Sequence, residues 1–316
     1  MSTSTPLDGK AAAGSATAAR GRISGAVWFA LALVYVVWGS TYLGIRIVVE
    51  TMPPFLSAGA RFITAGLLLA AVVAWRSGPA ALRATPAQLG SAALVGLMLI
   101  LGGNGLVVLA ETSVPSGLAA LLVAAVPMWV VVLRASTGDR PPRRTLGGVL
   151  VGLAGLAVLT GSGIGGAVRL SGVLMVVAAS VLWSLGSFSA SRLELPGNPF
   201  TGSAYQMVVG GTAAVVVGLL RGEQRGLDPA SVSTASWLAL AYLTLIGSLV
   251  GFTAYVWLLQ AAPLSLVSTY AYVNPVVAVA LGALILDEAL TWPIVVGGSV
   301  VVAAVGVIVS TERRKR

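Results

Sequence analysis

The sequence predicts an all-α membrane protein with ten transmembrane helices, arranged as two inverted five-helix repeats. Three observations lead to this fold class: the composition, the length of the apolar runs and an internal duplication. Of the 316 residues, 57% are apolar and only 9% are charged, and the mean hydropathy is +0.95. Because soluble domains carry about 25% charged residues, most of the surface of this chain is suited to a lipid bilayer.

The apolar runs have the length of membrane-spanning helices. A helix needs about 20 apolar residues to cross about 30 Å of hydrocarbon, where only helices and closed barrels satisfy their own backbone polar groups. Runs such as AVWFALALVYVVW are continuous, whereas barrel strands alternate. We expect spans near residues 26–47, 55–75, 88–110, 114–133, 146–161, 170–191, 200–220, 236–260, 264–286 and 293–311.

The distribution of cations predicts the orientation. Cytoplasmic loops retain Lys and Arg, and with the N-terminus inside, 14 of the 19 Lys and Arg residues fall on inner segments. Two more lie within spans, which leaves three in outer loops: Arg169, Arg221 and Arg225. Both termini are therefore expected in the cytoplasm, residues 1–24 as a disordered tail and residues 312–316 as a basic tail. The net charge of +9 then needs no nucleic acid as a partner.

The two halves of the chain repeat one another. Pro115 and Pro127 each have a counterpart 148 residues later, at Pro263 and Pro275. An offset of 145 residues relates Trp38 to Trp183, Phe55 to Phe200 and Gly66 to Gly211. We expect one repeat over 25–165 and the other over 166–311. Each holds an odd number of helices, so the second enters the membrane from the opposite side, as in secondary transporters that open a shared site alternately to each side.

Missing residue types exclude several kinds of chemistry. The chain has neither His nor Cys, which removes Ser-His and Cys-His catalysis and the usual zinc and haem ligands. GSGIGG at 161–166 follows an apolar helix and lacks the Lys-Ser/Thr of a phosphate loop. We therefore expect no cofactor, no metal and no ATP-driven step in this chain. A transporter is favoured over an enzyme, and a membrane-embedded enzyme using carboxylates is the distant alternative.

Four segments carry a family resemblance. They are VVWGSTYLGIR at 36–46, PPFLSAGARFITAG at 53–66, GNGLVVLAETSVPSGLAALLVAAVP at 103–127 and STYAYVNPVVAVALG at 268–282. In this order they resemble the drug/metabolite transporter (DMT) superfamily, within it the ten-helix EamA-type permeases of the bacterial inner (plasma) membrane. The resemblance covers about residues 25–311. It implies two five-helix EamA repeats, a central cavity and ATP-independent efflux of small metabolites, amino acids or amphipathic drugs, with an uptake permease as the alternative.

The resemblance also bears on coupling and assembly. The four-helix multidrug members of the superfamily use an acidic residue in their first helix for proton exchange, but the first span here has no carboxylate before Glu50. Coupling would then fall to Glu111 or to the substrate itself. Glu111 ends the third span, where a helix C-terminus disfavours negative charge, so it is either partnered by a cation or a hydrated loop acid. The chain is expected to be a monomer or a homodimer.

Ionisable and amide groups inside spans are the first candidates for substrate binding, because such groups face a cavity or a partner. Arg61 either meets a substrate carboxylate or Glu111, or it snorkels outward or joins two helices. Asn104, within LGGNGL, either lines the cavity or bridges helices. Asn274 precedes Pro275, where a helix break near mid-membrane and a tolerated kink are both possible readings.

Aromatic residues complete the expected binding set. Trp38 and Trp183 are repeat mates deep in the first and sixth spans, and Gln206 occupies the position that matches Arg61 at the 145-residue offset. Aromatic faces bind amphipathic and cationic ligands. We expect Trp38, Trp183 and Gln206 to line the site ahead of Tyr255 and Tyr270.

Overall fold

The computed structural model describes residues 24–138, 142–162, 168–190, 192–262, 267 and 269–313. These residues form helices and connecting turns, and no strand occurs among them. Most of the tails expected at 1–24 and 312–316, and the boundary expected between 165 and 166, lie outside the described residues.

The first half consists of five rods. They are α1 (Gly25–Thr51), α2 (Pro54–Ser77), a rod made of α3 (Pro86–Gly96), η2 (Leu97–Gly105) and α4 (Leu106–Ala110), a rod made of α5 (Ser116–Val123) and α6 (Val126–Ser136), and α7 (Arg143–Ser162). A short 3₁₀ turn, η1 (Pro79–Leu82), follows α2.

The second half has the same plan. Its rods are α8 (Leu170–Ala190), α9 (Pro199–Leu220), a rod made of α10 (Thr234–Tyr242), η4 (Leu243–Val250) and α11 (Gly251–Ala261), then α13 (Tyr270–Ile285) and α14 (Trp292–Arg313). A 3₁₀ turn, η3 (Glu223–Gly226), follows α9. Seven helices of the described chain are long and apolar enough to cross a membrane, and Val273–Ile285 and Trp292–Ile308 are shorter apolar helices. Counting each rod once, the five rods of the first half and the five of the second confirm the ten-helix prediction.

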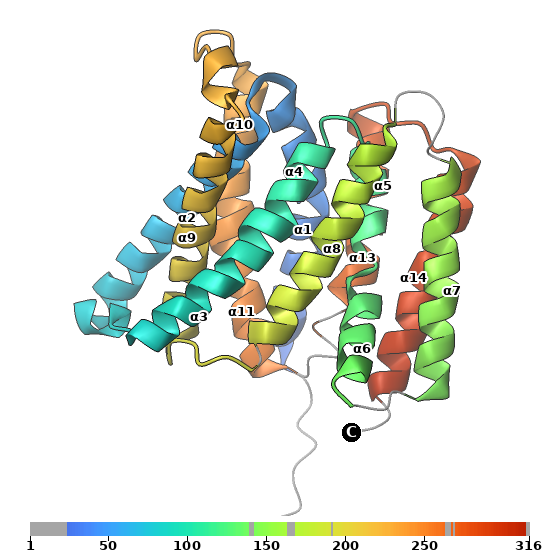
Figure 1. The fold of residues 1–316 in the computed structure, drawn as a ribbon, viewed down its shortest axis with the longest axis horizontal. Coiled ribbons are helices and arrows are strands. Elements are labelled where there is room, and N and C mark those ends of the chain that lie inside the picture. Colours follow the sequence, from blue (N-terminus) through green and yellow to red (C-terminus); the bar gives the residue numbers. More distant parts are fainter. Residues whose placement is uncertain are drawn as a thin grey trace, which may run out of the picture.

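Helices of one half pack on helices of the other (Figure 1). The α2 helix lies along α9, α7 along α14, and α1 along α13. Close approach is possible because small residues meet at these contacts: a Cβ added to Gly59 would lie 2.8 Å from the Gly211 carbonyl oxygen, and one added to Gly155 would lie 2.8 Å from Val300 Cγ1. The two halves therefore interlock instead of sitting side by side as separate domains.

Two details differ from the simplest reading of the sequence. Pro275 lies inside α13, which runs through it as a continuous helix, so the break considered at Asn274 does not occur. Conversely, the third rod of each half contains a π-helical segment, η2 and η4, which periodicity did not predict. The two segments occupy matching positions in the two repeats. Short π-helical segments within α-helices frequently lie at functional sites.

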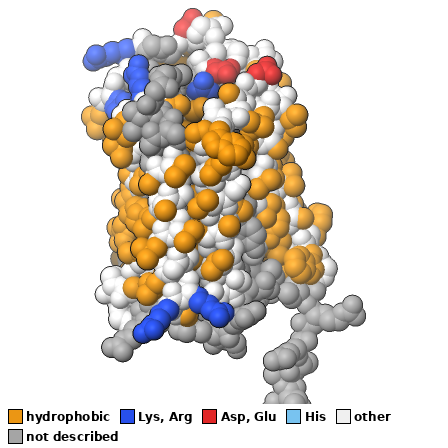
Figure 2. All heavy atoms as spheres, turned by 90° about the vertical axis from the view of Figure 1, so that its right-hand side faces the viewer, with side chains coloured by type: hydrophobic (Ala, Val, Ile, Leu, Met, Phe, Trp, Pro, Cys, Tyr) orange, Lys and Arg blue, Asp and Glu red, His pale blue; other side chains and the backbone are white. Residues whose placement is uncertain are grey.

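The outer surface is apolar around the waist of the bundle. Figure 2 views the α7 and α14 side, where hydrophobic side chains cover the middle, Lys and Arg side chains lie at both ends, and Asp and Glu side chains lie at the upper end. Large apolar side chains such as Leu150 on α7 and Val307 on α14 are exposed there. This distribution is that of a multi-pass membrane protein. The end at which α1 finishes and α2 begins is called the outer end below, because the cations predict that it faces away from the cytoplasm.

Candidate functional site

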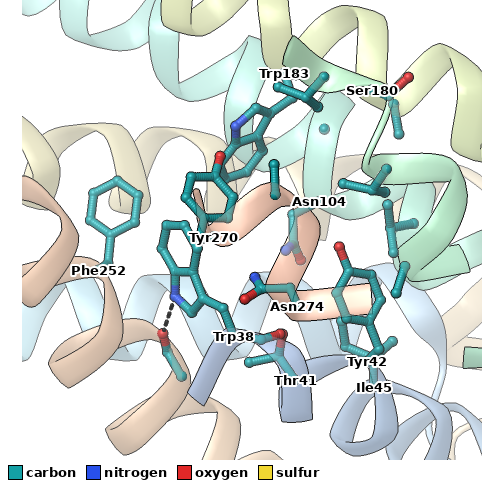
Figure 3. Close-up of a pocket in the computed structure, with 18 of the residues that line it drawn as sticks. Trp38, Thr41, Tyr42, Ile45, Asn104, Ser180, Trp183, Phe252, Tyr270 and Asn274 are labelled. Atoms are coloured by element: carbon teal, nitrogen blue, oxygen red, sulfur yellow. Dashed lines mark hydrogen bonds between the residues drawn. The ribbon is translucent and has the colours of Figure 1, made fainter. Parts of the chain in front are cut away.

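A cavity of about 100 Å³ lies between the two halves (Figure 3). Its walls come from α1, α2, η2, α4, α5 and α6 of the first half and from α8, η4, α11 and α13 of the second. The lining residues are Trp38, Thr41, Tyr42, Ile45, Arg61, Phe62, Ile100, Gly103, Asn104, Val107, Ala120, Val123, Ala124, Val126, Ala179, Ser180, Trp183, Gly247, Ser248, Phe252, Tyr270, Ala271, Asn274 and Pro275. Six of the eight residues expected to bind substrate are among them.

An aromatic cluster around Trp38 forms one wall. The Trp38 ring centroid lies 4.8 Å from that of Tyr255, 5.3 Å from that of Tyr270 and 6.3 Å from that of Trp183, the last two in edge-to-face geometry. Trp38 Nε1 donates to the carbonyl oxygen of Gly247 at 3.2 Å, the hydrogen bond drawn in Figure 3. The tryptophan thus links α1 to the π-helical segment η4.

Arg61 brings a positive charge to the cavity. It is only 5% exposed, and its Nε donates to Ser248 Oγ at 2.8 Å. Within the described part of the chain, its Nη1 is buried without a hydrogen-bond partner. Arg61 therefore both joins α2 to η4 and lines the cavity, and it does not snorkel to the surface. An unpaired buried guanidinium nitrogen is costly, which makes it a strong candidate to bind an acceptor on a solute.

Two amides lie across from the aromatic wall. Figure 3 shows Asn104 and Asn274 between the Trp38 ring and Tyr42. With the Asn274 amide turned so that its nitrogen faces the two nearby acceptors, that nitrogen donates to the main-chain carbonyls of Tyr35 at 3.2 Å and Tyr270 at 3.3 Å. Asn104 Oδ1 is buried and has no hydrogen-bond partner among the described residues. Asn104 thus lines the cavity with an amide oxygen that is buried and unpaired among the described residues, while the Asn274 side chain lies between α13 and α1.

Glu111 lies beyond the cavity lining, at the outer end of α4. It is 0% exposed, and both of its carboxylate oxygens lack a hydrogen-bond partner within the described residues. Arg46 donates to its main-chain carbonyl oxygen. The hydrated loop acid considered from the sequence is wrong, because this carboxylate is buried. Its role in coupling stays a prediction.

Two expected residues lie outside the lining. Gln206 is buried on α9, where its main chain packs against Gly96 of α3. Tyr255 packs on Trp38 and Tyr270 without lining the cavity. Their roles in binding stay predictions.

Several polar lining residues were not predicted from the sequence, namely Thr41, Tyr42, Ser180 and Ser248. One of them, Ser248, could have been predicted from the internal repeat. Ser248 lies 145 residues after Gly103, within the counterpart of the glycine-rich segment that holds Asn104.

A multi-pass helical protein with a cavity between two duplicated halves belongs to the class of membrane transporters, and the comparisons with known proteins agree. The model of the EamA-like transporter family matches residues 24–161 and again 170–310. The chain therefore belongs to the EamA-like transporter family, within the DMT superfamily. The two matches correspond to the two halves of the fold.

Relatives support the same assignment. The chain is 38% identical over 259 residues to the "Uncharacterized inner membrane transporter YedA" of Escherichia coli, covering 80% of each protein. It is 26% identical over 293 residues to the "Probable amino-acid metabolite efflux pump" of E. coli, covering 82% of this chain and 86% of the relative. A solved crystal structure superposes with a TM-score of 0.64 at 20% identity, over 93% of this chain and all of that one, which supports the fold alone.

Proposed function

We propose that this protein exports small organic solutes across a bacterial inner membrane, without ATP, by alternating access through the central cavity. The observation that carries the proposal is the cavity itself, which both halves line and in which the buried Arg61 Nη1 and Asn104 Oδ1 have no hydrogen-bond partner within the described chain. Since inverted repeats can rock about a shared site, exposure of this cavity to each side in turn is the motion that the architecture favours.

The polar and aromatic groups of the cavity suit a solute with a carboxylate and an apolar part. A guanidinium binds carboxylates with charge-assisted hydrogen bonds, so Arg61 would hold the carboxylate. Asn104 Oδ1 would accept from an ammonium or hydroxyl group of the same solute. The wall formed by Trp38, Trp183 and Tyr270 would cover its apolar part. Metabolites, amino acids and amphipathic drugs share this pattern, and an efflux pump named for amino-acid metabolites is among the relatives.

Glu111 is our candidate for coupling to protons. A buried carboxylate without hydrogen-bond partners is costly when ionised, and binding a proton relieves that cost. If it couples, Glu111→Gln should abolish the response of transport to a pH gradient while solute exchange without a gradient continues. An unchanged response in this variant would remove Glu111 from the coupling mechanism.

The direct test is flux in proteoliposomes. Purified protein should give saturable uptake of radiolabelled carboxylate solutes in the absence of ATP, measured over a panel of amino acids, organic acids and cationic dyes. Absence of flux across the panel would overturn the proposal. Arg61→Gln should abolish flux of anionic and zwitterionic solutes, whereas Arg83→Gln, the same change on the exposed loop after α2, should leave flux unchanged.

Two further measurements test the direction of transport and the orientation of the chain in the membrane. Loss of the gene in the host should raise the intracellular level of an exported solute, whereas an uptake permease would lower it. An impermeant label should reach the loop at 139–144 and the C-terminal tail only in opened cells if both lie in the cytoplasm. The assembly, a monomer or a homodimer, stays a prediction.

A further inference from the structure

A second cleft lies at the outer end of the bundle, apart from the central cavity. It has a volume of about 520 Å³ and is lined by Leu109, Thr112, Ser113, Arg169, Ser171, Met175 and Arg221. These residues come from the end of α4 and the loop after it, from the start of α8 and from the end of α9. No residue of this cleft lines the central cavity.

The cleft concentrates positive charge where the chain otherwise has little. Of the three cations expected in the outer loops, Arg169 and Arg221 line it, and both are exposed. No carboxylate is among the lining residues described above. Glu223, the acid closest along the chain to Arg221, is engaged elsewhere, since its Oε2 accepts from the backbone N–H groups of Phe55 and Leu56 at 3.0 Å each. The described lining of the cleft is therefore positively charged, as an anion would require.

The available donors suit an anion with several oxygens. Thr112 and Ser113 donate their hydroxyl protons to the carbonyls of Leu109 and Ala110, at 2.7 and 3.3 Å. The remaining lining residues with side-chain donors are Arg169, Arg221 and Ser171. Arg169 and Ser171 lie at the N-terminus of α8, where the helix dipole adds partial positive charge. Guanidinium and hydroxyl groups are the kinds of donor that bind a phosphate.

The position of the cleft at the ends of the helices favours the phosphate of a lipid headgroup. Arg169 directly precedes the first residue of α8, and Arg221 directly follows the last residue of α9, so both lie where the spans end and lipid headgroups begin. The neighbouring side chains of Leu170, Leu174 and Leu220 are 46%, 56% and 83% exposed. A cationic cleft next to exposed apolar side chains is complementary to a phospholipid, which has a phosphate above acyl chains.

We propose that this cleft binds the phosphate of an anionic phospholipid in the leaflet at the outer end. The lipid would contact Arg169 on α8 and Arg221 on α9 at the same time, and would thereby join the ends of two helices of the second half to the loop after α4. The proposal is independent of the solute that the central cavity transports.

Retention of lipid by the purified protein tests the proposal. Full-length protein is exchanged into nanodiscs of phosphatidylcholine and phosphatidylglycerol and then extracted in mild detergent. Native mass spectrometry then identifies the lipids that remain bound to it. Wild type should retain phosphatidylglycerol in preference to phosphatidylcholine. The double variant Arg169→Gln/Arg221→Gln should bind it more weakly, by about fivefold for each arginine removed.

Two controls keep the result specific. Arg225→Gln removes the third outer arginine, which is also exposed but does not line the cleft, and it should retain phosphatidylglycerol as wild type does. Arg169→Lys/Arg221→Lys keeps the charge and should restore most of the retention. If the Gln double variant aggregates, phosphatidylglycerol retention is compared between wild type, the Lys double variant and each single Gln variant instead.

Three results would overturn the proposal. Equal retention of phosphatidylglycerol by wild type and the Gln double variant would show that the lipid binds elsewhere. Equal thermal stabilisation of wild type by inorganic phosphate and by phosphatidylglycerol would assign the cleft to a soluble anion. Slower solute flux in the Gln double variant, with lipid retention unchanged, would make the cleft part of the solute path.

Discussion

The α2 and α9 helices are repeat mates that pack against one another, yet only α2 contributes side chains to the central cavity. Their packing is symmetric: Gly59 of α2 meets Gly211 of α9, and Gly66 of α2 meets Ala204 of α9, which are the same pair of positions exchanged between the repeats. Their chemistry is not symmetric, because Arg61 lines the cavity and its counterpart Gln206 does not. The two repeats thus share the packing of their backbones, but only the first repeat supplies a charged side chain, Arg61, to the central cavity.

The largest effect is expected where the shared packing is tightest. A Cβ added to Gly59 would lie 2.4 Å from Val215 Cγ2 and 2.8 Å from the Gly211 carbonyl oxygen, so Gly59→Ala should force the helices apart and cost about 1–3 kcal/mol of stability. Thermal unfolding of the purified protein measures this. Gly147→Ala on α7 is the matched control, because a Cβ there meets nothing within 4 Å. Equal melting temperatures for the two variants would contradict the close packing of α2 on α9.

The next effect concerns the asymmetry of the cavity. Asn104 corresponds to Leu249 at the 145-residue offset, so Asn104→Leu makes the first π-helical segment resemble the second. Loss of its unpaired acceptor should weaken solute binding about tenfold, equivalent to about 1.4 kcal/mol. Solute affinity from concentration-dependent flux is the measurement. An unchanged affinity would remove Asn104 from the binding site, while leaving Arg61 as its polar centre.

A smaller effect is expected at two carboxylates that link the halves at the outer end. Glu223 follows α9 and accepts from the first turn of α2, and Glu288 follows α13 and accepts from Ser116 N at 2.8 Å and Gly117 N at 3.1 Å at the start of α5. Because each carboxylate caps a helix N-terminus, Glu223→Gln and Glu288→Gln should each cost about 1 kcal/mol. Similar losses of melting temperature would show that the two links are equivalent. A loss confined to one variant would show that they are not.

The smallest effect is expected at Gln206. Because this side chain does not line the cavity in the structure, Gln206→Ala should change solute affinity by less than about twofold, in contrast to the loss of flux expected for Arg61→Gln. Flux measured at several solute concentrations separates affinity from protein yield. A large fall in affinity would restore Gln206 to the site and make the two repeats chemically more alike than the structure indicates.

Much of the cavity could be predicted because polar groups within spans are few. Arg61, Asn104 and Asn274 were identifiable as embedded polar residues, and Trp38 and Trp183 as repeat mates. The repeat offset did not place Gln206 in the cavity lining, because equivalent positions in the two halves share a backbone environment without sharing access to the cavity. Thr41, Tyr42 and Ser180 were missed, since a hydroxyl in a span can also bond its own helix, as Thr41 does to the Trp38 carbonyl at 2.6 Å.

The sequence alone determined that the chain spans a bilayer with ten helices in two duplicated halves, because hydrocarbon thickness sets the length of a span and unpaired backbone groups are excluded from lipid. Only the tertiary structure decided which face of each helix lines the cavity, where the π-helical segments lie, and that Arg169 and Arg221 share one cleft. The physical reason is that a helix surrounded by lipid is apolar on every side, so the pattern of its residues does not orient it. That orientation comes from close contacts between helices distant in sequence, such as the one between Gly59 and Gly211.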